Sequence, residues 1–89
     1  MDSDDVRIEF PCEDYPVKIL GEAAVAFREH VLTIVERHAP GFDSQRMEIR
    51  DSKNGNYQSI TLYIRATGPE QLSNLNTDLR TNSLVKMVL

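Results

Sequence analysis

The sequence predicts an α+β domain of the ferredoxin-like type, a two-layer sandwich with the element order βαββαβ. Its residue patterns follow the order strand, helix, strand, Asn-Gly turn, strand, helix, strand, with little chain left over. The predicted strands alternate apolar and polar side chains, which is typical of a sheet covered on one face. We therefore expect a four-stranded antiparallel sheet with two helices on one face. Right-handed crossovers place its first and third strands at the centre.

The first half of the chain contains one predicted strand and one predicted helix. Residues 15–20 form the strand, because apolar side chains occupy every second position. Gly21 is expected to break this strand, and the helix is predicted over residues 22–38. Pro40 and Gly41 then end the helix, since proline cannot continue it and glycine accepts a left-handed turn. The residues of its apolar stripe recur at helical spacing and are Ala24, Phe27, Val31, Ile34, Val35 and His38.

The second half begins with a predicted β-hairpin. Residues 45–51 and 57–67 both alternate, and the Asn-Gly pair between them is the strongest short hairpin signal. Pro69 can occupy the first position of a second helix. Residues 84–89 form the last predicted strand. The apolar stripe of the second helix consists of Leu72, Leu75 and Leu79.

Composition indicates an ordinary globular domain, with 40% hydrophobic and 27% charged residues. Residues 1–9 contain four acidic side chains and are predicted to form a flexible tail, followed by a single domain over residues 10–89. No apolar run approaches the roughly 18 residues of a membrane helix, and the N-terminus lacks the basic and apolar parts of a signal peptide. One cysteine cannot form an internal disulfide. We therefore expect a cytoplasmic protein with no membrane contact.

The face of the sheet that the helices leave bare is expected to bind a partner. The candidate partner-binding residues on this face are Lys18, Tyr63, Arg65 and Lys86. Leu20 of the first strand lies on the same face, and Lys86 lies there together with Leu84 and Val88 if Val85 and Met87 point toward the helices. Exposed apolar patches often mark an interface. The alternative is a last strand that is buried on both of its faces.

Four segments of the chain together carry a family resemblance, namely FPCEDYPVKILGE (residues 10–22), VERHAPG (35–41), SKNGNYQSITLYI (52–64) and VKMVL (85–89). In this order they resemble the YbeD-like family, a small group of bacterial proteins defined as a domain of unknown function. The match is loose over residues 68–82. The resemblance implies a bacterial cytoplasmic protein whose ferredoxin-like fold is similar to that of ACT domains, which are regulatory domains that bind small molecules.

Gly21 and Glu22 form the candidate ligand site. In ACT-like domains the junction between the first strand and the first helix contributes to an effector site, often across a dimer interface, so the resemblance implies a small-molecule effector here. Free N–H groups at a helix start favour an anion, and Glu22 can bind an amine. The alternative is ordinary helix-start chemistry, in which Glu22 complements the helix dipole.

Neither the cysteine nor the histidines form a catalytic or metal-binding set. Cys12 is followed by Glu13 and Asp14, whose charges disfavour the thiolate that a nucleophile needs. His30 and His38 are separated on the predicted helix by about 12 Å, which is too far for both to bind one metal ion. We therefore expect no catalytic residue, no metal and no cofactor.

These observations favour a non-catalytic regulatory or adaptor module that binds a partner protein, with a small ligand or a homodimer left open. The alternative is a module that binds single-stranded RNA or DNA on the bare face by stacking bases on aromatic side chains. Only Tyr63 and Tyr57 are available for stacking, and a net charge of −4 disfavours phosphate. An acylphosphatase-like enzyme with Arg28 in a phosphate cradle is disfavoured, because Glu22 would repel the anion.

Overall fold

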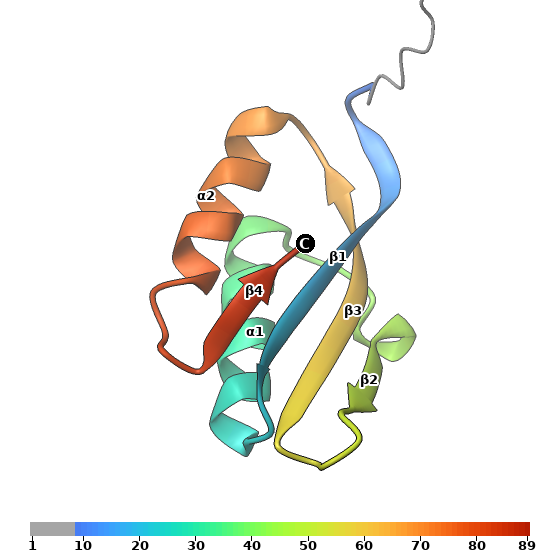
Figure 1. The fold of residues 1–89 in the computed structure, drawn as a ribbon. Coiled ribbons are helices and arrows are strands. Elements are labelled where there is room, and N and C mark those ends of the chain that lie inside the picture. Colours follow the sequence, from blue (N-terminus) through green and yellow to red (C-terminus); the bar gives the residue numbers. More distant parts are fainter. Residues whose placement is uncertain (1–8) are drawn as a thin grey trace, which may run out of the picture.

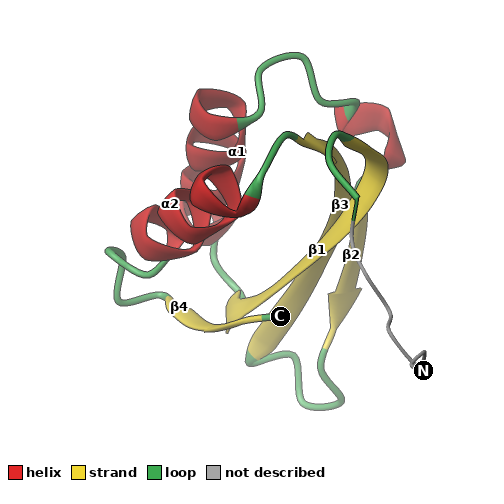
Figure 2. Cartoon of the chain, turned by 90° about the horizontal axis from the view of Figure 1, so that it is seen from above, coloured by secondary structure: helices red, strands yellow, loops and turns green. Residues whose placement is uncertain are grey.

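The computed structural model of the chain describes residues 9–89 and has the predicted ferredoxin-like fold (Figure 1). Its four strands form one antiparallel sheet with the order β2-β3-β1-β4, so the first and third strands are central as predicted. Both helices lie on the same face of the sheet (Figure 2). The predicted tail, residues 1–9, lies outside the described residues apart from Glu9. The elements are β1 (Cys12–Glu22), α1 (Val25–His38), the short 3-10 helix η1 (Ser44–Arg46), β2 (Glu48–Asp51), β3 (Tyr57–Ala66), α2 (Pro69–Leu79) and β4 (Val85–Val88).

The core lies between the two helices and the two central strands. Alternate residues of β1 and β3 point toward the helices, as the period of two predicts, and meet the apolar stripes of α1 and α2. The described residues include no buried polar or charged residue. No helix among residues 9–89 has the length and apolar character needed to cross a membrane. The largest fully buried side chains are Phe27, Ile19, Ile60, Leu62, Ile64, Leu79, Val31 and Val35.

The junction between β1 and α1 differs from the sequence prediction. Gly21 does not break the strand, and Glu22 does not begin the helix: both belong to β1, and α1 begins at Val25. A Cβ atom on Gly21 would lie 2.5 Å from Cδ1 of Phe27 and 2.6 Å from the carbonyl oxygen of Leu84. Glycine is therefore needed here because the helix approaches the strand closely, and not because the strand ends.

The predicted alternation of the last strand is wrong at three positions. Leu84 and Val88 pack against the core, whereas Met87 is 47% exposed. Val85 faces the core as predicted. The reason is a β-bulge. Val85 and Met87 are two residues apart on β4 but lie opposite the adjacent residues Gly21 and Leu20 of β1, so Lys86 is an extra residue in β4. The pairs that define this register are Gly21 with Val85, Leu20 with Met87 and Ile19 with Val88.

β2 is shorter than the predicted strand of residues 45–51. The carboxylate of Asp43 accepts a hydrogen bond of 2.9 Å from the backbone N–H of Gln45, and this contact caps η1. Strand pairing therefore begins only at Glu48, which lies opposite Thr61. Within the described residues, the part of β3 beyond Thr61 has β1 as its sole strand neighbour.

The two helices are joined by a polar contact. Nε2 of His38, the last residue of α1, lies 2.5 Å from Oδ2 of Asp78 in α2, and Nη1 of Arg37 lies 3.5 Å from the same oxygen. The hydrogen bond to His38 has the largest effect and lowers the pKa of Asp78 below its ordinary value of 3.8. Desolvation, the next largest effect, opposes it, and the charges of His38 and Arg37 lower the pKa further. The contact therefore favours the ionised carboxylate.

Replacing Gly21 with alanine should destabilise the protein by about 1–3 kcal/mol, because the added methyl group overpacks the site between Phe27 and Leu84. Urea denaturation followed by circular dichroism measures this change. Gly68→Ala is the matched control, since a Cβ atom there meets nothing within 4 Å. A Gly21→Ala variant as stable as the Gly68→Ala variant would contradict the close packing described above.

The Asp78 contact predicts a pH dependence with a definite sign. A carboxyl group whose pKa is lower in the folded protein stabilises the fold above its unfolded pKa of 3.8, and that stabilisation is lost as the pH falls through the folded pKa. The Asp78→Asn variant should therefore lose less stability than the wild type between about pH 6 and about pH 2.5. Urea titrations at several pH values measure both slopes, and equal slopes would show that the Asp78 contact has no thermodynamic effect.

Candidate functional sites

One face of the sheet is left uncovered by the helices, and we call it the open face. Its side chains alternate with those of the core, so they follow from the register of the strands. Among the exposed hydrophobic residues on this side are Met87, which is 47% exposed, and Leu89, which is 65% exposed. The open face comprises Pro16, Lys18, Leu20 and Glu22 of β1, Glu48 and Arg50 of β2, Tyr57, Ser59, Thr61, Tyr63 and Arg65 of β3, Lys86 and Met87 of β4, and Leu89.

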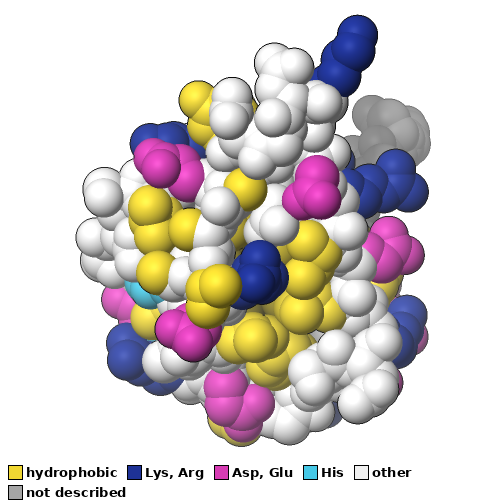
Figure 3. All heavy atoms as spheres, turned by 90° about the horizontal axis from the view of Figure 1, so that it is seen from below, with side chains coloured by type: hydrophobic (Ala, Val, Ile, Leu, Met, Phe, Trp, Pro, Cys, Tyr) yellow, Lys and Arg dark blue, Asp and Glu magenta, His cyan; other side chains and the backbone are white. Residues whose placement is uncertain are grey.

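Exposed hydrophobic side chains also lie at the end of the molecule where α1 and β3 begin, which is the lower end in Figure 1. Figure 3 shows this end, where they gather around a basic side chain. Val25 is 58% exposed at the start of α1, and Tyr57 is 50% exposed at the start of β3. Exposed apolar surface is therefore present on the helix layer as well as on the open face.

The structure spreads the candidate partner-binding residues over the open face and does not bring them together. Lys18 lies near the centre, opposite Thr61. Nζ of Lys86 lies at one end, 3.2 Å from Oε2 of Glu22. Tyr63 and Arg65 lie at the other end, where they line a cavity. The open face therefore presents separate regions with different chemistry.

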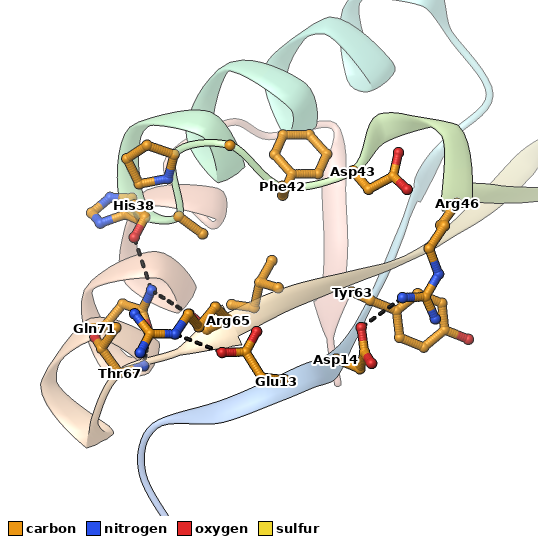
Figure 4. Close-up of a pocket in the computed structure, with 14 residues that line it drawn as sticks. Glu13, Asp14, His38, Phe42, Asp43, Arg46, Tyr63, Arg65, Thr67 and Gln71 are labelled. Atoms are coloured by element: carbon orange, nitrogen blue, oxygen red, sulfur yellow. Dashed lines mark hydrogen bonds and ion pairs between the residues drawn. The ribbon is translucent and has the colours of Figure 1, made fainter.

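The cavity beside Tyr63 has a volume of about 420 Å³, and we call it the edge cavity (Figure 4). Its walls are the loop that follows α1, the residue Arg46 of η1, and the adjoining ends of β1 and β3. It lies beside the part of β3 that β2 does not pair. The side-chain amide of Gln71 closes one end by donating hydrogen bonds to the carbonyl oxygens of His38 and Arg65.

A bulge in β1 shapes the edge cavity. Between the pairs Cys12–Ala66 and Tyr15–Ile64, the two residues Glu13 and Asp14 lie opposite the single residue Arg65. Asp14 has a φ angle of 56°, a left-handed conformation that aspartate tolerates better than most residues. The bulge turns both carboxylates toward the cavity, as Figure 4 shows.

The arginines of the edge cavity are already paired. Nε of Arg65 lies 2.7 Å from Oε2 of Glu13, and Nη1 of Arg46 lies 2.6 Å from Oδ1 of Asp14. The guanidinium of Arg46 also stacks on the ring of Tyr63, 4.5 Å from its centre. The ring of Tyr63 is therefore partly covered, which makes it a poor platform for stacking a base.

A second hollow lies on the open face and has a volume of about 220 Å³. Ser59 forms its floor, because this small residue lies on a central strand between Leu20 on β1 and Arg50 on β2. Lys18 and Tyr57 complete its rim. We call this site the Ser59 hollow. The remaining lining residues are Asp51, Ser52 and Gln58.

Gly21 and Glu22 do not have the geometry on which their predicted ligand site rested. The helix begins three residues later, at Val25, so the backbone N–H groups of its first turn do not follow Gly21 directly. The carboxylate of Glu22 is paired with Lys86, and its backbone N–H donates a hydrogen bond of 2.9 Å to the carbonyl oxygen of Leu84. A ligand-binding role for this pair stays a prediction.

The cysteine is half-buried, and both histidines contact other groups of the fold. Cys12 is half-buried at the start of β1. Nε2 of His30 lies 3.0 Å from the carbonyl oxygen of Leu79, and His38 contacts Asp78. No group of three His, Cys, Asp or Glu side chains within residues 9–89 is arranged to hold a metal ion. Sequence reasoning missed the pairing of Asp14 with Arg46, because no glycine marks the left-handed residue of the bulge.

Solved structures similar to this one have the same fold at low sequence identity. The solution structure of protein HP0495 from H. pylori matches with a TM-score of 0.67 and 17% identity, covering 99% of this chain and 91% of that one. The crystal structure of the ACT domain from GTP pyrophosphokinase of Chlorobium tepidum matches with a TM-score of 0.58 and 22% identity, covering 85% of this chain and 96% of that one. These likenesses show an ACT-like fold.

Bacterial relatives match at much higher identity. A UPF0250 protein from Azotobacter vinelandii is 47% identical over 93% of this chain and 90% of its own length. Another from Ectopseudomonas mendocina is 46% identical over the same shares of the two chains. The family described as "Protein of unknown function (DUF493)" matches residues 5–89. The chain therefore belongs to the DUF493 family of UPF0250 proteins, the YbeD-like family that its sequence resembles.

Proposed function

We propose that this protein is a non-catalytic regulatory or adaptor module that binds a partner protein through its open face. The observation that carries this proposal is the exposed apolar surface on the uncovered side of the sheet. Met87 and Leu89 are 47% and 65% exposed there, and Leu20 lies directly opposite Met87. Large apolar side chains that are exposed together on a sheet favour an interface.

The fold supports a regulatory role. The chain has the same fold as the ACT domain from a GTP pyrophosphokinase. The family resemblance implies a likeness to ACT domains, which are regulatory domains that bind small molecules. We therefore extend the proposal to a small effector, with the Gly21–Glu22 junction as its candidate site. We place the protein in the bacterial cytoplasm, and we include a second copy of the chain among the proteins that the open face can bind.

The histidine and arginine side chains that could take part in catalysis make hydrogen bonds within the protein. His30 and His38 make hydrogen bonds within the helix layer. Arg28, which the acylphosphatase alternative would need in a phosphate cradle, donates a hydrogen bond of 3.3 Å to the side-chain oxygen of Gln58. These contacts favour a binding module over an enzyme.

The geometry favours a protein partner over single-stranded nucleic acid. Stacking needs free aromatic faces on the central strands, whereas Arg46 covers the ring of Tyr63. A nucleic-acid site also needs several cations to neutralise phosphates, and most cations at the ends of the open face are paired with carboxylates.

Replacing Met87 with glutamate should abolish partner binding, because a charge at the centre of a desolvated apolar contact is costly. Affinity capture from the native cytoplasm, with mass spectrometric identification and recovery measured for each variant, tests this expectation. Wild type should enrich a specific protein, and Met87→Glu should lose at least about 90% of that signal.

Val25→Glu is the matched control for this experiment. Val25 is 58% exposed but lies on the helix layer, and glutamate is favourable in the first turn of a helix. The control should recover the same partner as wild type. Equal recovery with Met87→Glu, together with a monomeric protein at high concentration in light scattering, would contradict binding through the open face.

A further inference from the structure

The Ser59 hollow has a shape and charge that define what can fill it. We propose that it binds the carboxylate of an acidic side chain from an extended segment of the partner protein. The neighbouring surface of Leu20 and Met87 receives an apolar side chain of the same segment. This inference rests on the proposed function and adds to it the chemical class of the partner.

The hollow exists because one small residue is surrounded by large ones. Ser59 lies between Leu20 and Arg50 in the direction across the strands, where neighbouring strands are about 4.8 Å apart. Tyr57 precedes it by two residues on the same face of β3. Lys18 lies next to Leu20 on the same face of β1, opposite Thr61. The space above Ser59 is therefore open to solvent and bounded by four long side chains.

Two cations border the hollow without a carboxylate partner among residues 9–89. Lys18 and Arg50 form no ion pair within this part of the chain. Four other cations do pair with carboxylates, namely Arg37, Arg46, Arg65 and Lys86. Lys18 and Arg50 come from different strands on the two sides of β3, so an anion above Ser59 can interact with both.

The acidic residues near the hollow are too few to cancel the positive charge of its lining. Asp51 contributes to the lining, but its Oδ1 accepts a hydrogen bond of 2.9 Å from the amide of Gln58. Glu48 is on the open face opposite Thr61 and does not line the hollow. Two cations and one acid give the lining a formal charge of +1, in a protein whose net charge is −4. An anionic group is therefore complementary to this site and not to the protein as a whole.

The apolar surface beside the hollow selects a mixed ligand. Leu20 forms one wall of the hollow and lies opposite Met87, so apolar surface continues from the hollow onto β4. An extended peptide presents residues i and i+2 on the same side. A segment in which a large apolar residue is two positions from a glutamate can place one side chain on Leu20 and Met87 and the other above Ser59.

A carboxylate suits the site better than a chain of phosphates. Binding to a nucleic-acid backbone depends on the neutralisation of several phosphates, whereas the hollow offers two cations. Tyr57 is the single aromatic residue of the lining, which leaves no pair of rings for successive bases. Nucleic acid is therefore an outcome to be tested against the acidic peptide.

The test is an NMR titration of the labelled protein with blocked pentapeptides. The probe is Thr-Leu-Thr-Glu-Thr, and its control replaces Glu with Gln. The Glu peptide should shift the amide signals of Ser59 and its neighbours and bind several-fold more tightly than the Gln peptide. Lys18→Gln and Arg50→Gln should each weaken the Glu peptide by about two- to fivefold, as expected for one exposed ion pair. Raising the salt from about 50 mM to about 300 mM should also weaken it.

Two further variants keep the test decisive. Arg80→Gln changes the net charge equally, lies just after α2 and away from the hollow, and should leave binding unchanged. Ser59→Leu should fill the hollow and abolish the preference for Glu over Gln, and a thermal melt shows whether the variant folds. Equal affinity for the two peptides in the wild type would overturn the proposal. So would binding of an octathymidylate that Lys18→Gln and Arg50→Gln weaken while neither peptide binds.

The outcome separates this proposal from the broader one. If Met87→Glu loses a captured partner but Lys18→Gln and Arg50→Gln do not, the open face is an interface and the acidic-segment proposal fails alone. If Met87→Glu captures the partner as well as wild type does, and the protein is monomeric at high concentration, the open face itself is not the interface and both proposals fail.

Discussion

The architecture depends on how closely α1 lies against β1. Phe27 packs where Gly21 has no side chain, and a single added carbon there would collide with the ring. That contact brings the apolar stripe of α1 down onto Ile19, Ile60 and Leu62, and α2 packs beside α1 on the same face. Because both helices are used on one side, the opposite side of the sheet has no cover within the described residues. The open face is a consequence of the packing and not a separate feature.

Charge is distributed unevenly on that open face. At one end the bulge in β1 pairs Glu13 and Asp14 with two arginines, and at the other end Glu22 pairs with Lys86. These ends are electrically balanced, and exposed pairs of this kind add little stability. The centre differs, because Lys18 and Arg50 border a hollow and apolar residues lie beside them. An anionic group with an apolar neighbour fits that centre better than it fits either end.

The order of the elements could be predicted from the sequence because each has a strong periodic signal. Alternation in β3 and helical spacing in α1 both come from burial on one side, so the pattern and the fold have the same cause. The errors are local, and those that concern which face a side chain occupies have a common origin. The bulges at Glu13–Asp14 and at Lys86 shift the alternation by one residue, and no glycine or proline marks either site. Lys18 was placed correctly on the open face, but the Ser59 hollow depends on which residues lie opposite one another, and that register is a property of the folded sheet.

The most direct test of a one-sided sheet is the solvent accessibility of two methionine methyl groups. Met87 is 47% exposed on the open face, whereas Met47 packs against the core. In methyl-labelled protein, a soluble gadolinium chelate should broaden the Met87 methyl signal strongly and the Met47 signal much less. A Met87 signal that is protected as well as that of Met47, in the isolated monomer, would show that the face is covered and would remove the basis for an interface there.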